Sequence, residues 1–402
     1  MSIKDFILDL SKVNKSENVF STPKHINEDS AYLSELSKIY NEIERVALQH
    51  HWACLINETK AIKRAVKQYY DGRIDLSLQL IGKIIKELKQ VPYICTAFNN
   101  CCAFNNNIPI NIRNYNNVSL YRARTGIPDN FEDISSMYHI PFNKREKVRS
   151  QRFSIPGFPC LYLGKSVYTC WMELSQPSDS EFYVSRVTVD DCIRIFNLSV
   201  NFYDLEKLCD ALKSDTLEDV HSIYRGVTTE EFILNYTKLW ILCLACSFKV
   251  KEANRQFKSD YIVPQLVMLA LKRYHIPAIA YLGKTFCEDE PYHNFAKLNL
   301  NVAIIMDGKD TFIYKKNKCE FSELMKKIQL SYPINYSQFK NLKNFRSSEK
   351  GESDNAQDNP QCFVNHHIKI AGTYKSYDHT YFCEFERYID IIQKKCTCEV
   401  KS

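Results

Sequence analysis

The chain has 402 residues, of which 45% are apolar and 25% are charged, and its formal net charge is +6. This length and composition are typical of a globular protein whose core needs no disulfide or metal to stabilise it. The positive charge is compatible with an anionic ligand, and it is not concentrated in a tail of the kind that binds DNA.

Neither a secretion signal nor a membrane span is predicted. The first twenty residues lack the apolar core and cleavage site of a signal peptide. The most apolar run, 239–248, is about half as long as a membrane span. We therefore expect a cytoplasmic protein with no membrane partner. Its sixteen cysteines are then expected to be free thiols, and because no pair has the usual spacing of zinc ligands, no metal is predicted.

Residues 1–115 are expected to form a helical domain. Apolar residues recur at helical intervals over 51–70 and again over 74–90, and Asp71-Gly72 lies between the two stretches. This pattern predicts a helical hairpin. Two copies of Ala-Phe-Asn-Asn within 97–106 predict a polar loop near the boundary with the next domain.

Residues 116–325 are expected to form the catalytic domain, because the pattern changes there to short strands mixed with a few helices. Strands are predicted at 118–124, 159–164, 181–189, 192–200, 278–284 and 300–306. Helices are predicted at 166–175, 204–212, 229–247 and 263–275. This mixture favours an α+β fold over regular βαβ alternation.

Residues 326–402 are expected to contain a linker and a small C-terminal α/β element. The segment 346–361 is polar and lacks apolar periodicity, which predicts a flexible linker or a disordered loop. The segment 363–395 predicts two strands and an amphipathic helix that pack on the rest of the chain.

Two groups of arginines point to an anion. The first strand of the middle region places Arg122 and Arg124 on one face, where two cations need an acidic partner or an anion. A basic run over 144–152 includes Arg149 and Arg152. Since the guanidinium fork matches two phosphate oxygens, this run is consistent with a pyrophosphate-binding loop. A nucleic-acid patch and a solvated basic loop are the alternatives.

A tyrosine and a carboxylate follow the basic run directly. Tyr162 lies on the next predicted strand, and Ser166 is a good N-cap for the helix after it. On that helix Glu173 lies about 60° from Cys170, at the border of the apolar stripe. A carboxylate at this border can face a cleft, and the alternative is a surface glutamate paired with a nearby lysine.

These residues, in this order, resemble the RES domain, a family named for an arginine, a glutamate and a serine. The resemblance covers about 118–307 and is carried by the segments LYRAR, HIPF, RSQRFSIPGFPCLYLG and WMEL. It implies a fold similar to ADP-ribosyltransferases. It also implies a bacterial toxin or defence effector that consumes NAD by phosphorolysis or hydrolysis, and that is restrained by an antitoxin or another regulatory protein.

The resemblance assigns roles to particular residues. The expected catalytic residues are Glu173, Arg122 and Tyr162, and the expected NAD-binding residues are Arg124, Arg149, Arg152, Thr285 and Asn294. The chain departs from the family where the serine is expected, because it has Leu282-Gly283 there. Either Thr285 or Ser166 then substitutes for the serine, or activity is reduced.

The expected function is therefore cleavage of the bond between nicotinamide and ribose. NAD is the expected substrate, phosphate or water the expected acceptor, and no metal is required. One alternative is an ADP-ribosyltransferase that modifies a macromolecule. Another is a non-catalytic regulatory or nucleic-acid-binding protein, although nucleic-acid binding would leave Tyr162 and Glu173 without a role.

Overall fold

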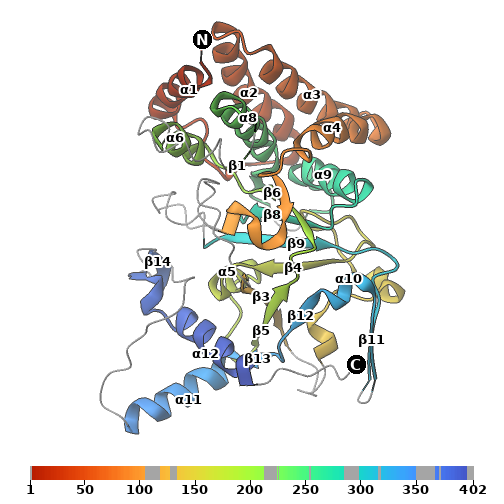
Figure 1. Ribbon diagram of the computed structural model, residues 1–402, viewed down its shortest axis with the longest axis vertical. Coiled ribbons are helices and arrows are strands. Elements are labelled where there is room, and N and C mark those ends of the chain that lie inside the picture. Colours follow the sequence, from red (N-terminus) through yellow and green to blue (C-terminus); the bar gives the residue numbers. More distant parts are fainter. Residues whose placement is uncertain are drawn as a thin grey trace.

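The computed structural model describes residues 2–104, 118–126, 134–211, 224, 226–252, 255–284, 298–315, 318–349, 367–370 and 373–395. Helices gather at one end of the molecule, a mixed sheet occupies the middle, and a smaller element of helices and a hairpin lies at the other end (Figure 1). The α+β class predicted from the sequence is confirmed.

The helical layer begins with the four N-terminal helices. They are α1 (Ile3–Glu17), α2 (Tyr32–Gln49), α3 (Ala53–Tyr70) and α4 (Ile74–Leu88). The predicted hairpin is confirmed as α3 and α4, and Gly72 allows the turn because its φ of +75° is a conformation that favours glycine.

Later segments complete this layer. They are α6 (Phe202–Ala211), α8 (Thr229–Cys246) and α9 (Ile262–Arg273). The apolar run predicted to be buried forms the end of α8, where the hydroxyl of Tyr40 donates to the carbonyl of Ile241 at 2.7 Å. In the described part of the chain, no helix combines the length and the apolarity that crossing a bilayer requires.

As far as the structure describes the chain, the central sheet has nine strands in the order β12-β5-β3-β4-β9-β8-β6-β2, with β13 paired to β5. Their bounds are β2 (Cys95–Ala97), β3 (Leu120–Thr125), β4 (Cys160–Gly164), β5 (Phe182–Val189), β6 (Arg194–Leu198), β8 (Ala278–Leu282), β9 (Leu300–Ile305), β12 (Ile328–Leu330) and β13 (Ile334–Asn335). Within the described part of this sheet, β6 and β8 pair in parallel and the other pairs are antiparallel. The six strands and four helices predicted for this region are confirmed.

The remaining short elements lie around this sheet. Strand β1 (Lys24–Ile26) pairs with β7 (Phe248–Val250), and β10 (Phe312–Lys315) forms a hairpin with β11 (Lys318–Phe321). Helix α10 spans Glu323–Lys326.

The sheet is open at one place, between β3 and β4. Their ladder contains a single residue pair, Tyr121 with Gly164, whereas β3 pairs with β5 over six residues. The guanidinium of Arg122 spans the gap and donates to the carbonyl of Tyr162 at 2.9 Å. The two strands therefore diverge and leave space between them.

The predicted polar loop at 97–106 is wrong over the residues that the structure describes. Residues Cys95–Ala97 form the edge strand β2, which pairs with β6, and two 3₁₀ turns follow. Phe98 is fully buried and packs against Phe104 with ring centroids 5.4 Å apart. Burial of this aromatic surface outweighs the polarity of the neighbouring asparagines.

The C-terminal element contains α11 (Tyr336–Glu349), β14 (His367–Ile370), β15 (Thr373–Ser376) and α12 (Tyr381–Lys395). The predicted strands and amphipathic helix are confirmed. The predicted linker is wrong over 346–349, which continue α11, and its other residues lie outside the described part. The ring of Phe382 lies 5.4 Å from that of Trp171, so α12 packs directly on the helix that carries Glu173.

Candidate active site

A cavity of about 630 Å³ opens where β3 and β4 diverge. Its walls come from β3, β4, β8 and β9 and from the segments 147–159 and 249–261. Nine basic side chains line it: Arg122, Arg124, Lys147, Arg149, Arg152, Lys249, Arg255, Lys258 and Lys284. Among the residues that the structure describes, two carboxylates, Glu173 and Asp260, line it as well.

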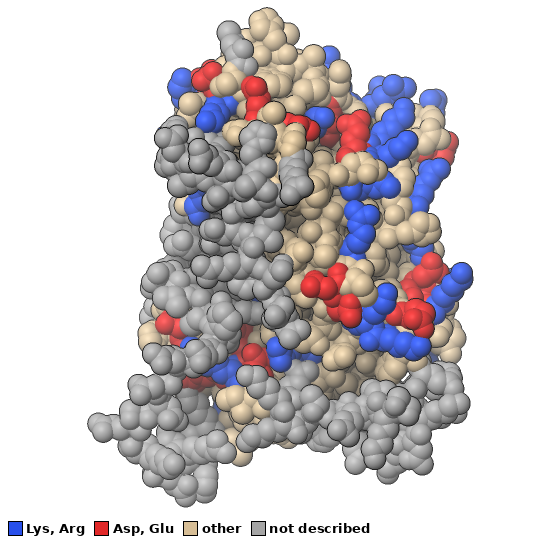
Figure 2. All heavy atoms as spheres, viewed as in Figure 1, with Lys and Arg blue, Asp and Glu red and all other residues tan. Residues whose placement is uncertain are grey.

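The charge of the cavity differs from that of the outer surface. On the face shown in Figure 2, basic side chains are most frequent toward the right edge, and acidic side chains lie among them. The cavity instead gathers cations around one space, where the partly buried ones are screened less by water than on the surface. This arrangement favours an anionic ligand.

Helix α5 (Val167–Glu173) brings Glu173 to the cavity. It can follow β4 at once because Gly164 has no side chain; a Cβ there would lie 2.7 Å from the sulfur of Cys170. Ser166 caps the helix as predicted, since its Oγ accepts from the backbone N–H of Thr169 at 3.0 Å. Ser166 is fully buried and does not line the cavity, so its hydroxyl acts there as a helix cap.

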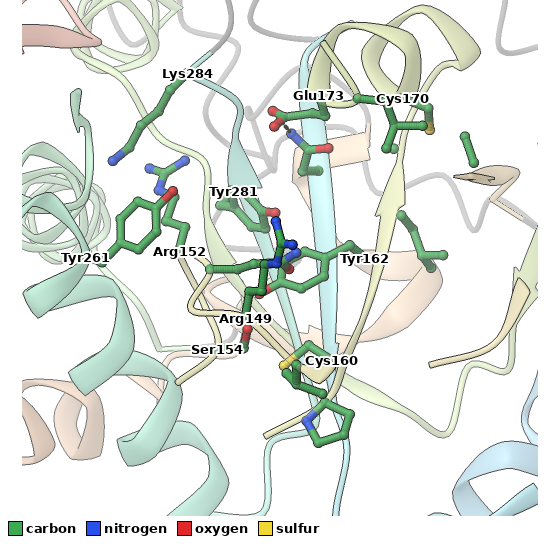
Figure 3. A pocket seen from close by; sticks show the side chains of 18 of the residues that line it. Arg149, Arg152, Ser154, Cys160, Tyr162, Cys170, Glu173, Tyr261, Tyr281 and Lys284 are labelled. Atoms are coloured by element: carbon green, nitrogen blue, oxygen red, sulfur yellow. Dashed lines mark hydrogen bonds between the residues drawn. The ribbon is translucent and has the colours of Figure 1, made fainter. Parts of the chain in front are cut away.

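The carboxylate of Glu173 is held by the sheet. The amide Nδ2 of Asn301 donates to its Oε1 at 3.1 Å (Figure 3). A Cβ built at Gly283 would lie 2.8 Å from the same oxygen and 2.4 Å from Oδ1 of Asn299. The absence of a side chain at Gly283 therefore leaves the room that the Glu173 carboxylate occupies.

Arg122 and Arg124 both face the cavity, as their alternation predicts. In the described part, their hydrogen bonds go to backbone carbonyls: Arg122 donates to Tyr162 and Met137, and Arg124 to Tyr138. Burial lowers the pKa of both guanidinium groups. The positive charge of Arg124 lowers the pKa of Arg122 further, to about 9. Both side chains are still cations at neutral pH, and no described carboxylate neutralises them.

Arg152 and Arg149 also line the cavity (Figure 3). The guanidinium of Arg152 donates to the carbonyls of Leu282 and Cys246 and lies 5.1 Å from the centre of the Tyr281 ring. Its Nε is buried without a partner among the described residues, as is that of Arg124. Arg149 is exposed at the cavity.

Aromatic rings form another part of the lining. Tyr162 and Tyr281 lie near one another in Figure 3, and burial raises the pKa of both hydroxyls.

The structure places all six described residues of the predicted set in one cavity. The predicted Thr285 and Asn294 lie outside the described residues.

Sequence reasoning missed a second group of lining residues. It comprises Lys249, Arg255, Lys258, Asp260, Tyr261, Tyr281, Lys284 and Asn301. Two of them reach the cavity through strand register: Asn301 of β9 pairs with Gly164 of β4 on one side and Tyr281 of β8 on the other. Strand alternation could have placed Tyr281 on a sheet face, but it could not show which strand was its neighbour.

The C-terminal element supports the glutamate helix. Glu386 of α12 is buried, and its Oε1 accepts from the backbone N–H of Val167 and from the hydroxyl of Tyr377, both at 2.6 Å. Burial raises the pKa of Glu386 to about 8. The first turn of α5 is thus fixed from outside the sheet by a carboxyl that the folded chain keeps protonated at neutral pH.

We expect Glu386→Gln to reduce the pH dependence of stability. Between the ordinary carboxyl pKa of 4.5 and about 8, the folded chain holds a proton that the unfolded chain releases. The free energy of unfolding therefore falls as pH rises through this window, by up to about 1.4 kcal/mol per pH unit. Glutamine keeps a neutral acceptor and removes this dependence. Urea unfolding at pH 5, 6, 7 and 8, with Glu384→Gln as control, measures it; parallel curves for Glu386→Gln and wild type would contradict the expectation.

The fold and the site together define an α+β protein whose mixed sheet opens on a cationic cavity with a positioned glutamate. No protein-family model matches the chain. It is 34% identical over 227 residues to a Bacillus subtilis (strain 168) protein named "Putative toxin YopC", and the match covers 56% of this chain and 47% of that protein. The chain thus spans about half the length of this curated relative, and it is similar to a protein named as a toxin.

The chain also has a weak likeness to a solved structure. The crystal structure of the M. tuberculosis MbcT–MbcA toxin–antitoxin complex matches with a TM-score of 0.27 and 12% identity, over 57% of this chain and 90% of that chain. A likeness of this size carries no argument about the fold or the site.

Proposed function

We propose that the chain is a toxin of the RES type that degrades NAD in this cavity by cleaving the bond between nicotinamide and ribose. The observation that carries the proposal is the positioned carboxylate of Glu173 in a cavity whose described lining includes nine cations. NAD offers matching groups: a pyrophosphate for the arginines, an aromatic ring for the tyrosines and a ribose for the carboxylate. The similarity to a protein named as a toxin supports the biological role.

Cleavage proceeds through a ribose cation. The bond from C1′ of ribose to the ring nitrogen breaks, and nicotinamide leaves as a neutral base with the bonding electron pair, so no general acid is needed. Positive charge develops on the sugar, as in glycoside hydrolysis, and the Glu173 carboxylate stabilises it. An oxygen of water or phosphate then bonds to C1′, and attacking water releases a proton.

The remaining residues bind and orient NAD. Arg124 and Arg152 line the cavity, and a guanidinium group matches the oxygens of a pyrophosphate. Arg122 also holds β4 in place through the carbonyl of Tyr162. Its removal would disturb the sheet, so loss of activity in Arg122→Ala would not separate binding from folding.

Arg149 allows a cleaner test of anion binding. It is exposed at the cavity, so we expect Arg149→Gln to raise KM for NAD about tenfold, the low end for a bond to a charged group. The kcat and the melting temperature should stay unchanged. Arg145→Gln is the matched control because Arg145 is exposed in the same segment and does not line the cavity. Equal KM values for the two variants would remove Arg149 from the binding site.

The proposed function is tested by following the products of NAD labelled in its adenylate phosphate. Free ADP-ribose is expected if water is the acceptor, and ADP-ribose 1-phosphate if phosphate is. Label on protein or nucleic acid would instead identify an ADP-ribosyltransferase. Label that stays in NAD would contradict the proposed function.

A further inference from the structure

A chain of alternating charges links the N-terminal helical layer to the cavity. Asp29 lies just before α2, and its Oδ2 pairs with Nε of Arg255 at 2.6 Å. Arg255 also pairs with Asp260, and the other oxygen of Asp260 lies 3.1 Å from the ammonium of Lys284. We call these four residues the charge chain.

The charge chain is buried along most of its length. The side chains of Arg255 and Lys284 are each 11% exposed, and that of Asp260 is 5% exposed. The other oxygen of Asp29 accepts from the backbone N–H of Ser259 at 2.6 Å. Because buried charges are placed only where partners satisfy them, Asp29 fixes the segment that presents Asp260 to Lys284.

Lys284 lies at the end of the charge chain and lines the cavity. Figure 3 shows it beside Arg152 and Tyr261, and its ammonium lies 5.4 Å from the centre of the Tyr261 ring. Burial, followed by the charge of Arg152, lowers the pKa of Lys284 to about 8. An anion bound between the ammonium and the guanidinium would relieve their repulsion.

We propose that Lys284 and Arg152 together bind a phosphate group of the ligand, and that the N-terminal helical layer sets the position of Lys284 through the charge chain. This inference rests on the proposed function for the identity of the ligand, but the anion site is testable without NAD cleavage. The N-terminal layer is then part of the binding site, and Asp29 is a positioning residue that acts through Lys284.

The test is the binding of inorganic pyrophosphate to the full chain, measured by titration calorimetry. We expect Lys284→Met to raise the Kd at least about tenfold, as for loss of one charge-assisted bond, and Lys284→Arg to raise it much less. Asp29→Asn should raise the Kd several-fold. Glu35→Gln is the matched control, because Glu35 lies in the same layer and pairs only with exposed Lys38 in the described part. Melting curves identify any variant that does not fold.

The double variant Asp29→Asn with Lys284→Met separates a positioning role of Asp29 from a merely structural role. If Asp29 acts through Lys284, the double variant should bind pyrophosphate no more weakly than Lys284→Met alone. If the increases in Kd of the two single variants multiply in the double variant, Asp29 does not act through Lys284. If Lys284→Met binds pyrophosphate with wild-type affinity, or if the wild-type chain does not bind it, the anion site is wrong. Nicotinamide release from NAD, measured on the same preparations, tests the proposed function separately. Pyrophosphate binding without nicotinamide release contradicts only the proposed function. Nicotinamide release without pyrophosphate binding contradicts only this inference.

Discussion

Glu173→Gln is expected to lower the rate of NAD cleavage by about 10³-fold, which is typical for loss of one preorganised electrostatic contact. The substitution removes the negative charge that stabilises the ribose cation. It keeps the shape of the side chain and an oxygen that accepts from Asn301, so the melting temperature should not change. Nicotinamide release and thermal unfolding, measured on the same preparation, check both parts.

Glu181→Gln is the control for this prediction. Glu181 is exposed shortly after α5 and does not line the cavity. It should therefore keep wild-type activity. A Glu173→Gln variant that consumes NAD at the wild-type rate would show that this carboxylate is not catalytic.

Gly283→Ala is expected to lower kcat by about 10²-fold, the cost of displacing a reacting group by roughly an ångström. The added Cβ would lie 2.8 Å from Oε1 of Glu173 and 2.4 Å from Oδ1 of Asn299. Since real Cβ atoms do not approach so closely, the carboxylate must move. Steady-state kinetics of the variant measure the effect.

The control for Gly283→Ala is Gly308→Ala. A Cβ at Gly308 meets nothing within 4 Å, and its backbone conformation accepts other residues. That variant should behave as wild type. If Gly283→Ala retained full activity, the observed position of the Glu173 carboxylate would not be the one that cleaves NAD.

Local patterns predicted most elements and six of the residues that line the cavity. Alternation and helical spacing act over a few residues, so they identify β3 with Arg122 and α5 with Glu173 without knowledge of the rest of the chain. The six predicted residues that share the cavity all come from one stretch, 122–173. Their roles in NAD cleavage are still predictions.

Long-range pairing explains what the sequence did not reveal. Lys284 and Asn301 join the site because β8, β9 and β4 are neighbours in the sheet, and neighbours are not encoded in local periodicity. The charge chain adds Asp29, more than 200 residues from its partner Arg255. At 97–104 the asparagines led to the prediction of a polar loop, although Phe98 is buried. Composition does not show which side chains face the core.

The most direct test of the central claim is a proton NMR time course of NAD incubated with the wild-type chain and with Glu173→Gln, in buffers with and without phosphate. We predict that the wild-type chain releases one nicotinamide for each NAD consumed, and that Glu173→Gln releases almost none over the same time. NAD that stays intact beside folded wild-type protein in both buffers would contradict the account.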